Sequence, residues 1–365
     1  MAVDAGQTTA QFTTAIAAAI TADPSLQVTA SATTNVVTLT ARHRGLTGND
    51  LALGRNLLGG AGGEVAPAGL AITLAGMSGG TTAPDLAAPL ANLGGEDFEF
   101  YVMPYTDSAS LNALRDHLAS RWSWDRMLYG GAFSGFRGTL SAAVTFGLTR
   151  NDQHMICLPA DASPTSPWLW AANLAGACAV SLRADPGIPL HGLRLDVMAP
   201  PRDRRWADVD DRNVLLNNGL GAFTVGPDGA VTTDTLVTTY RLNPQGVPDD
   251  SWLYPERMYC IAAIIRRLKA YVATTFGRFK LASDGGRYRP GSNIVTPLVL
   301  RDGILAEYRR MEFDGLIQDY DQFAAELEVV RDSGNRCRVN GLLPIVPIDQ
   351  FRQFAAAVQP RNATL

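Results

Sequence analysis

Strand-like and helix-like patterns alternate between residues 86 and 200, and this alternation constrains the fold more than any other feature of the chain. Strand candidates begin at residues 98, 127 and 154, which are 29 and 27 residues apart, close to the length of one βαβ unit. A helix candidate follows each strand, over residues 107–122, 134–149 and 168–182. Strands joined by crossover helices run parallel and are covered by those helices. The spacing therefore predicts an α/β core with a central, mostly parallel sheet and flanking helices.

The first 80 residues have a different character. An alanine-rich helix candidate over 8–22 ends before Asp23-Pro24. Short β-like runs separated by glycines follow it, at residues 26–30, 36–41, 51–53 and 70–74. We therefore predict a small α+β module over residues 1–80, before an α/β core over 81–200.

Residues 201–365 are predicted to form a third, α+β domain, so that the chain as a whole is α+β. A polar helix is expected over 203–217. Two strand candidates at 219–225 and 231–241 flank the turn sequence Gly226-Pro227-Asp228-Gly229, which predicts a hairpin. The remaining elements are two helices and a closing pair of strands, over residues 254–280, 296–316, 326–331 and 336–343.

The composition argues against several classes of protein. The net charge is −4, so no global basic field points to nucleic acid. No apolar run approaches the roughly 20 residues that span a bilayer, so direct membrane insertion is not expected. The four cysteines are widely spaced, and three lie in apolar runs, which favours buried free thiols over a zinc site or a disulfide framework. No cofactor or metal is implied.

One short motif raises the alternative of an enzyme. Residues 76–80 read Gly-Met-Ser-Gly-Gly, which has the G-x-S-x-G spacing of a nucleophile elbow around Ser78. An elbow needs a helix that begins at the serine, but glycines, threonines and a proline follow it here. The histidines available for a triad are His117 on a helix candidate, His154 at the start of a strand candidate, and His191, which has Asp185 nearby. The alternative is an α/β hydrolase with Ser78 or His191 in a pocket; the favoured interpretation of the motif is a domain junction.

Basic residues gather in one stretch of this acidic chain. Seven of them lie between residues 266 and 289: Arg266, Arg267, Lys269, Arg278, Lys280, Arg287 and Arg289. Only Asp284 opposes them, which leaves a local net charge of +6. The pattern fits either a solvated helix flank or a surface that docks an acidic partner.

Longer stretches of the sequence resemble the tail sheath proteins of contractile phages, specifically the Mu-like type. In the second half of the chain they are ASPTSPWLWAA (162–172), VMAPPRDR (197–204), LLNNGLGAFTV (215–225), LVTTYR (236–241), GVPDDS (246–251), FKLASDG (279–285) and IVTP (294–297). Upstream they are TARHRG (40–45), GND (48–50) and VMPYTD (102–107). The match is collinear over nearly the whole chain.

This resemblance implies a structural protein and not an enzyme. Sheath subunits polymerise helically around a tail tube, and the cylinder contracts to drive the tube through the envelope of the target cell. The implied partners are other copies of the chain, the tail tube protein, and the baseplate and tail terminator proteins. The implied location is the virion tail, after assembly in the bacterial host cytoplasm. A baseplate role or a non-phage injection sheath is the alternative within the same machinery.

The resemblance also implies roles for particular regions. The tube-facing region belongs to the C-terminal domain, so residues 266–289 are expected to contact an acidic tube. The module over 1–80 resembles a domain inserted on the sheath exterior, and residues 76–80 become the return from it.

Terminal arms in such sheaths add strands to a sheet of neighbouring subunits. Family members usually carry a further segment before the point where this chain begins. The C-terminal arm of this chain would present Phe354, Ala356 and Val358. Its alanines and Pro360 disfavour a strand. We therefore expect a monomer or small oligomer in dilute solution.

Overall fold

The computed structural model describes residues 6–56, 59–64 and 69–359. The chain forms two compact units. The first comprises Met1–Ala177 with His191–Leu253, and the second comprises Cys178–Leu190 with Tyr254–Leu365. The division into three domains at residues 80 and 200 stays a prediction.

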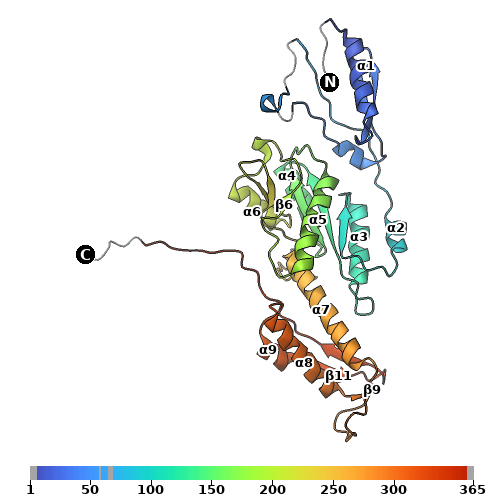
Figure 1. Ribbon diagram of the computed structural model, residues 1–365, viewed down its shortest axis with the longest axis vertical. Helices are drawn as coiled ribbons and strands as arrows, with labels where there is room; N and C mark the ends of the chain where they lie inside the picture. The colour runs from blue at the N-terminus through green and yellow to red at the C-terminus, as the bar shows by residue number, and fades with distance from the viewer. Residues whose placement is uncertain (1–5, 57–58, 65–68, 360–365) are drawn as a thin grey trace, which may run out of the picture. The chain divides into compact units, whose positions relative to one another are not determined.

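A three-stranded parallel sheet lies at the centre of the first unit (Figure 1). Its order is β3 (Phe100–Met103), β4 (Gly131–Arg137) and β5 (Met155–Ala160), with Phe100 opposite Gly131 and Ala132 opposite Met155. The helices that follow these strands are α3 (Ser108–Arg121), α4 (Leu140–Leu148) and α5 (Pro167–Ala184). The α3 residues Leu111, Leu114 and Leu118 are buried in one cluster with residues of all three strands. The predicted α/β core with a parallel sheet is therefore confirmed.

Strand β4 lies several residues later than predicted. The sequence placed a strand at 127–132 and a helix at 134–149, whereas β4 runs to Arg137 and α4 begins at Leu140. A Cβ atom on Gly135 would lie 2.3 Å from the carbonyl oxygen of Pro167, so only glycine lets the strand pass this close to the start of α5. The small residues of β4 are thus selected by packing, which the helical pattern of the sequence did not reveal.

The N-terminal part of the first unit is a helix packed on a hairpin. Helix α1 (Thr9–Ala22) begins with a capping box between Thr8 and Gln11, and it contacts β1 (Val28–Thr33) and β2 (Val36–Ala41). The predicted strands at 51–53 and 70–74 are wrong, because these runs are irregular and pair with no strand. Two short 3-10 turns, η1 (Leu46–Asp50) and η2 (Gly60–Gly62), and helix α2 (Ala87–Asn92) complete this region.

A second, antiparallel sheet closes the first unit. Its order is β6 (Arg194–Leu195), β8 (Val231–Thr233) and β7 (Phe223–Val225), which confirms the predicted hairpin. The predicted helix over 203–217 is divided into η3 (Arg202–Arg204) and α6 (Val209–Asn217). Trp206 has φ of +47°, which no helix accommodates, and the Asp208 side chain caps the new start of the helix.

The second unit is built on three helices: α7 (Pro255–Phe276), α8 (Pro297–Phe313) and α9 (Tyr320–Glu326). Ile264, Leu268, Tyr308 and Phe323 belong to its buried core, in which the Tyr308 and Phe323 rings stack with centroids 3.7 Å apart. Strands β9 (Lys280–Leu281) and β10 (Ile294–Val295) pair in parallel, and β11 (Glu328–Arg331) and β12 (Val339–Leu342) form an antiparallel hairpin. The predicted closing pair of strands is confirmed.

Candidate subunit and partner interfaces

The glycine-rich motif that contains Ser78 lies where the chain returns toward the central sheet. The side-chain amide of Asn49 accepts a hydrogen bond from the Gly80 backbone N–H and donates one to the Gly80 carbonyl, each 2.9 Å long. The Leu46 N–H donates to the carbonyl of Thr82 at 2.9 Å. A Cβ on Gly80 would lie 2.3 Å from the carbonyl oxygen of Gly45. The glycines therefore serve a close crossing of two chain segments.

Ser78 does not lie in a nucleophile elbow. It is exposed, and residues 70–86 around it form neither strand nor helix. An elbow requires a strand that enters and a helix that leaves the turn. The local geometry that would expose and activate a serine nucleophile is therefore not formed at Ser78.

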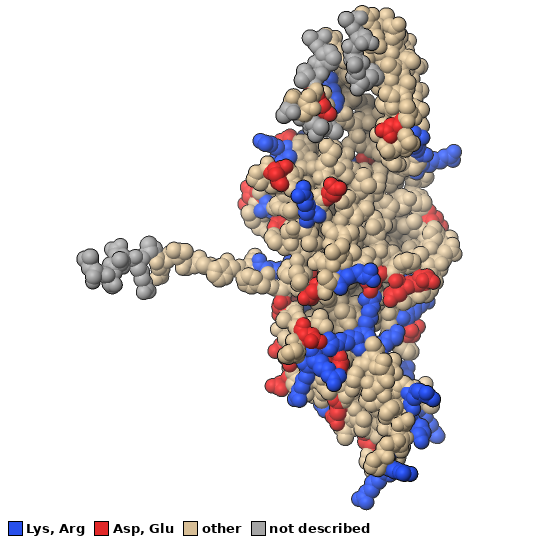
Figure 2. Space-filling view, in the orientation of Figure 1, with Lys and Arg blue, Asp and Glu red and all other residues tan. Residues whose placement is uncertain are grey.

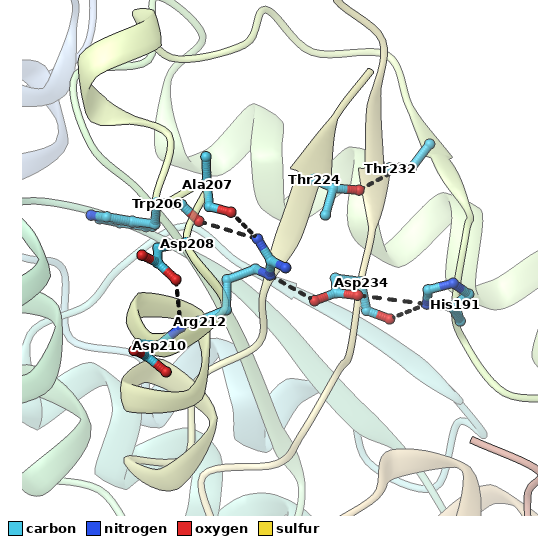
Figure 3. A network of polar contacts seen from close by, with 9 residues as sticks. All are labelled: His191, Trp206, Ala207, Asp208, Asp210, Arg212, Thr224, Thr232 and Asp234. Carbon is cyan, nitrogen blue, oxygen red and sulfur yellow. Dashed lines mark hydrogen bonds and ion pairs between the residues drawn. The ribbon is translucent and has the colours of Figure 1, made fainter. Parts of the chain in front are cut away.

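His191 belongs to a polar network on the antiparallel sheet of the first unit (Figure 3). Its Nδ1 atom lies 2.5 Å from the carbonyl oxygen of Asp234 and 3.9 Å from a carboxylate oxygen of the same residue. The other carboxylate oxygen of Asp234 accepts a hydrogen bond of 3.1 Å from Nε of Arg212. Nη1 of the same arginine donates to the carbonyl of Ala207 at 2.7 Å. The network fastens helix α6 to strand β8.

Two of the stretches that carry the family resemblance, residues 162–172 and 197–204, are joined by hydrogen bonds. The buried hydroxyl of Ser163 accepts from Nε1 of Trp170 at 2.9 Å and donates to the carbonyl of Met198 at 2.8 Å. The Thr165 hydroxyl accepts from the N–H of Met198 at 2.8 Å. These hydrogen bonds give Ser163, Thr165 and Trp170 a structural role that joins residues 162–172 to residues 197–204.

The described residues hold no cluster of three or more His, Cys, Asp or Glu side chains that could bind a metal ion. Within the same residues, no helix is both long and apolar enough to cross a bilayer. Cys157, Cys178 and Cys260 are free and buried, and burial raises the pKa of Cys157 and Cys260 to about 12. Such thiols stay protonated and inert at neutral pH.

The structure divides the seven basic residues of the 266–289 stretch into two groups. Arg266, Arg267 and Lys269 lie along helix α7. Arg267 is committed within its own unit, because its guanidinium is 2.7 Å from Glu307 Oε1 and 2.6 Å from Asp314 Oδ2. Arg267 therefore fastens α7 to α8 and does not offer a free charge to a partner.

The other four basic residues follow the end of α7. Arg278, Lys280, Arg287 and Arg289 are all exposed, and their side chains make no ion pair with another described residue. Figure 2 shows Lys and Arg side chains gathered at this end of the unit with few acidic ones among them. We call these four residues the distal basic group.

The β11–β12 hairpin presents two exposed apolar side chains, beside Glu328 and Asn340, on its outer face, and it has open edges. Glu328 pairs with Leu342 and Val330 with Asn340, so Val330 and Leu342 lie on the same face. They are 56% and 63% exposed, whereas Val329 on the opposite face packs against the core. In the described chain neither strand pairs with a third. The hairpin is supported on one face by α8 and the core, and its unpaired edges can accept an added strand.

The C-terminal arm begins at a buried ion pair. Arg352 Nη2 lies 2.8 Å from Oε1 of Glu256, and the same oxygen accepts the Leu190 N–H at 2.7 Å. The Glu256 side chain is 0% exposed and that of Arg352 is 17% exposed. The guanidinium also stacks 3.8 Å above the Tyr254 ring. One carboxylate in the first turn of α7 thus holds the root of the arm.

Beyond Arg352 the arm contacts little. Residues 350–359 form no helix or strand, and Figure 1 shows them extending from the rest of their unit. Phe354 and Val358 are 81% and 88% exposed, and Ala356 is exposed as well. Pro360, which we took to disfavour a strand, lies outside the described residues.

Sequence reasoning missed Glu256, Arg352 and Asn49. Glu256 and Arg352 are 96 residues apart, and no pattern in either segment links them. Asn49 had a signal, since it lies in the stretch GND that supports the family resemblance. Its hydrogen bonds to Gly80 could be identified only from the structure.

Comparison with known proteins identifies the family of this chain. The model of the phage tail sheath protein central domain matches residues 79–233, and that of the phage tail sheath C-terminal domain matches residues 247–361. The Mu-like prophage FluMu tail sheath protein of Haemophilus influenzae is 37% identical over 340 residues, which make up 93% of this chain and 69% of that protein.

Two solved structures are similar at 15% identity. The sheath tail protein from Listeria innocua has a TM-score of 0.53 over 77% of this chain and 61% of its own. The sheath tail protein from Desulfitobacterium hafniense has a TM-score of 0.49 over 88% of this chain and 65% of its own. The chain thus spans less than two thirds of either solved protein, and the Listeria likeness supports the fold alone. With the family models and the 37% identical relative, the chain belongs to the phage tail sheath family, among its Mu-like members.

Proposed function

We propose that this sheath subunit polymerises head to tail around a tail tube, and that its C-terminal arm links neighbouring copies. As a member of the sheath family, the chain is a structural subunit of a contractile tail and part of the virion tail. Contraction would repack the subunits and drive the tube through the envelope of the target cell.

The observation that carries the proposal is that an exposed arm and a two-stranded hairpin with open edges occur in the same unit. Phe354, Ala356 and Val358 alternate along an extended segment, so they would share one face of an added strand. Paired with an edge of the β11–β12 hairpin, Phe354 and Val358 could continue the apolar face formed by Val330 and Leu342. The backbone of the new strand would form hydrogen bonds with the unpaired N–H and C=O groups at the open edge.

An arm that pairs with the hairpin of another copy makes a heterologous contact. Such a contact generates an open helix when its repeated rotation does not close into a ring, and we assign this helical case to the sheath. The two ends of the polymer then differ, and each needs its own partner, which we assign to the baseplate at one end and the tail terminator at the other. Assembly would take place in the bacterial host cytoplasm.

The tube contact is assigned to the 266–289 stretch of the second unit. Of its seven basic residues, the distal basic group supports this role best, because these four charges are exposed and uncommitted. An acidic tube wall would complement them. In dilute solution without a tube, the chain is expected to stay a monomer or small oligomer, since each arm contact is small.

Inter-chain cross-linking tests the arm contact. One population carries Leu342→Cys and another carries Val358→Cys, both with the exposed Cys337 changed to serine. Mixed at high concentration under mild oxidation, they should form a disulfide between the two chains. The matched control places the first cysteine at Val247, which is 55% exposed in a loop of the first unit. Cross-linking to position 247 as efficient as that to position 342 would contradict the proposal.

A further inference from the structure

A pocket of about 470 Å³ opens beside the distal basic group. Its walls come from Phe279, from the loop between β9 and β10, and from the first turn of α8. The apolar lining residues Phe279, Tyr288, Leu298 and Val299 are 38%, 47%, 55% and 45% exposed. The pocket therefore offers apolar surface that its own unit leaves in water.

The exposure of Leu298 and Val299 follows from the way α8 packs. This helix directs Ile304, Tyr308 and Met311 into the core of the second unit, at spacings of 4 and 3 residues. The first-turn N–H groups of α8 are satisfied locally, since Asp284 accepts from Leu298 N at 3.1 Å and Thr296 accepts from Val299 N at 3.4 Å. The pocket is thus not an anion site made by a bare helix end; its lining combines exposed apolar side chains with Asp284, Arg289 and uncharged polar residues.

The segment that forms most of this pocket is basic. Between residues 278 and 296 there are four basic residues and one acidic residue, Asp284, which leaves a net charge of +3. The carboxylate of Asp284 is already used at the start of α8. Arg289 lines the pocket itself. An occupant must therefore be acidic around its rim and apolar at its centre.

We propose that this pocket anchors one aromatic or large aliphatic side chain of an acidic protein segment. The inference rests on the proposed function in one respect: the segment belongs to the tube wall. It refines the sequence-based expectation, because the anchor is apolar and the charges select and orient the partner. Nucleic acid is the weaker fit, since the chain carries a net charge of −4 and the pocket wall includes Asp284 and four exposed apolar side chains.

The test uses the full chain and a fluorescent peptide of glutamates and aspartates with one central tryptophan. Fluorescence anisotropy should show binding that weakens as salt rises. Replacing the tryptophan by alanine should weaken binding by about tenfold, the effect of losing one anchoring side chain. Arg287→Glu with Arg289→Glu should weaken it by a similar factor, and so should Leu298→Asp in the pocket wall.

The control is Arg44→Glu with Arg55→Glu, which reverses two exposed charges in the first unit. It should bind the peptide like the wild type, and circular dichroism should show that every variant is folded. Equal binding of the tryptophan and alanine peptides would overturn the anchor, as would tighter binding of a single-stranded oligonucleotide than of the peptide. Absence of any peptide binding would overturn it too. Polymerisation is measured separately, so failure of the pocket and failure of the sheath proposal are distinguishable.

Discussion

The side-chain amide of Asn49 pairs with the backbone of Gly80 through two hydrogen bonds of 2.9 Å. This pairing fastens the N-terminal helix and hairpin to the segment that returns to the central sheet. Gly80→Ala should open the crossing, because the new Cβ would lie 2.3 Å from the Gly45 carbonyl oxygen. Asn49→Ala should cost about 1 kcal/mol for each lost hydrogen bond. Limited proteolysis between residues 45 and 85 measures the loosening.

Two nearby substitutions serve as controls for that prediction. Gly76→Ala meets no atom within 4 Å, and Ser78→Ala changes an exposed side chain outside any helix or strand. Both should leave the proteolysis rate unchanged. A Gly80→Ala variant as resistant as Gly76→Ala would show that the crossing is not tight.

The Glu256–Arg352 pair predicts a large cost for a single substitution near the end of the chain. Arg352→Ala leaves the Glu256 carboxylate buried without its cation, which should lower the free energy of unfolding by about 3–5 kcal/mol. Arg115→Ala is the matched control, because the pair of Arg115 with Asp116 is also 2.8 Å long but is exposed on both sides. Its loss should cost at most about 1 kcal/mol. Urea denaturation that gives equal losses for the two variants would contradict a buried anchor.

A buried histidine predicts lower stability in mild acid. Burial lowers the pKa of His154, against the opposing charge of Asp152. The unfolded chain therefore takes up a proton below about pH 6.5 that the folded chain refuses. The contribution of His154 is present above that pH, and it is lost by up to about 1.4 kcal/mol per pH unit as the pH falls toward the folded pKa. Burial raises the pKa of Asp152, so protonation of that carboxyl as the pH falls favours the folded chain and opposes the effect of His154.

Thermal unfolding at pH 7.5 and 5.5 checks this prediction. The wild type should lose more stability between the two values than His154→Gln, whose side chain does not titrate. His191→Gln controls for the loss of a histidine as such, because its side chain is 66% exposed. The same pH dependence in the wild type and His154→Gln would refute the assignment.

Substitution of Arg267 and of Arg287 should show that the first residue stabilises the fold and that the second does not. Arg267→Ala removes the contacts with Glu307 and Asp314 and should lower the free energy of unfolding by about 1.5–3 kcal/mol. Arg287→Ala changes an exposed side chain and should stay within about 0.5 kcal/mol of the wild type. Chemical denaturation of both variants gives the comparison. Equal stability would mean that the ion pairs of Arg267 contribute nothing.

The regular spacing of strands and helices was enough to predict the parallel sheet, since burial of β5 and of one face of α3 imposes a pattern on the sequence. Strand β4 was misplaced because Gly135 owes its position to the close approach of Pro167 and not to any strand propensity. The runs at 51–53 and 70–74 look like strands, but the chain there offers them no pairing edge.

The candidate surfaces were predictable only in outline. Charge counting found the 266–289 stretch, but only the fold shows that Arg267 is committed to Glu307 while Arg287 is exposed. The pocket walls at Leu298 and Val299 lie outside that stretch, and their exposure depends on the rotation of α8. Glu256 and Arg352 are ordinary surface residue types that become a buried pair through contacts distant in sequence.

Negative-stain electron microscopy that compares the concentrated wild-type chain with the double variant Val330→Asp/Leu342→Asp tests the central claim most directly. Both residues lie on the outer face of the β11–β12 hairpin, where the arm of a neighbour should add a strand. The wild type should form striated cylinders, and the double variant should remain dispersed although folded. The control Val247→Asp/Leu148→Asp, at positions 55% and 58% exposed in the first unit, should assemble like the wild type. Cylinders from the double variant that match those of the wild type, or a folded wild type that forms none at any concentration, would contradict assembly through this hairpin.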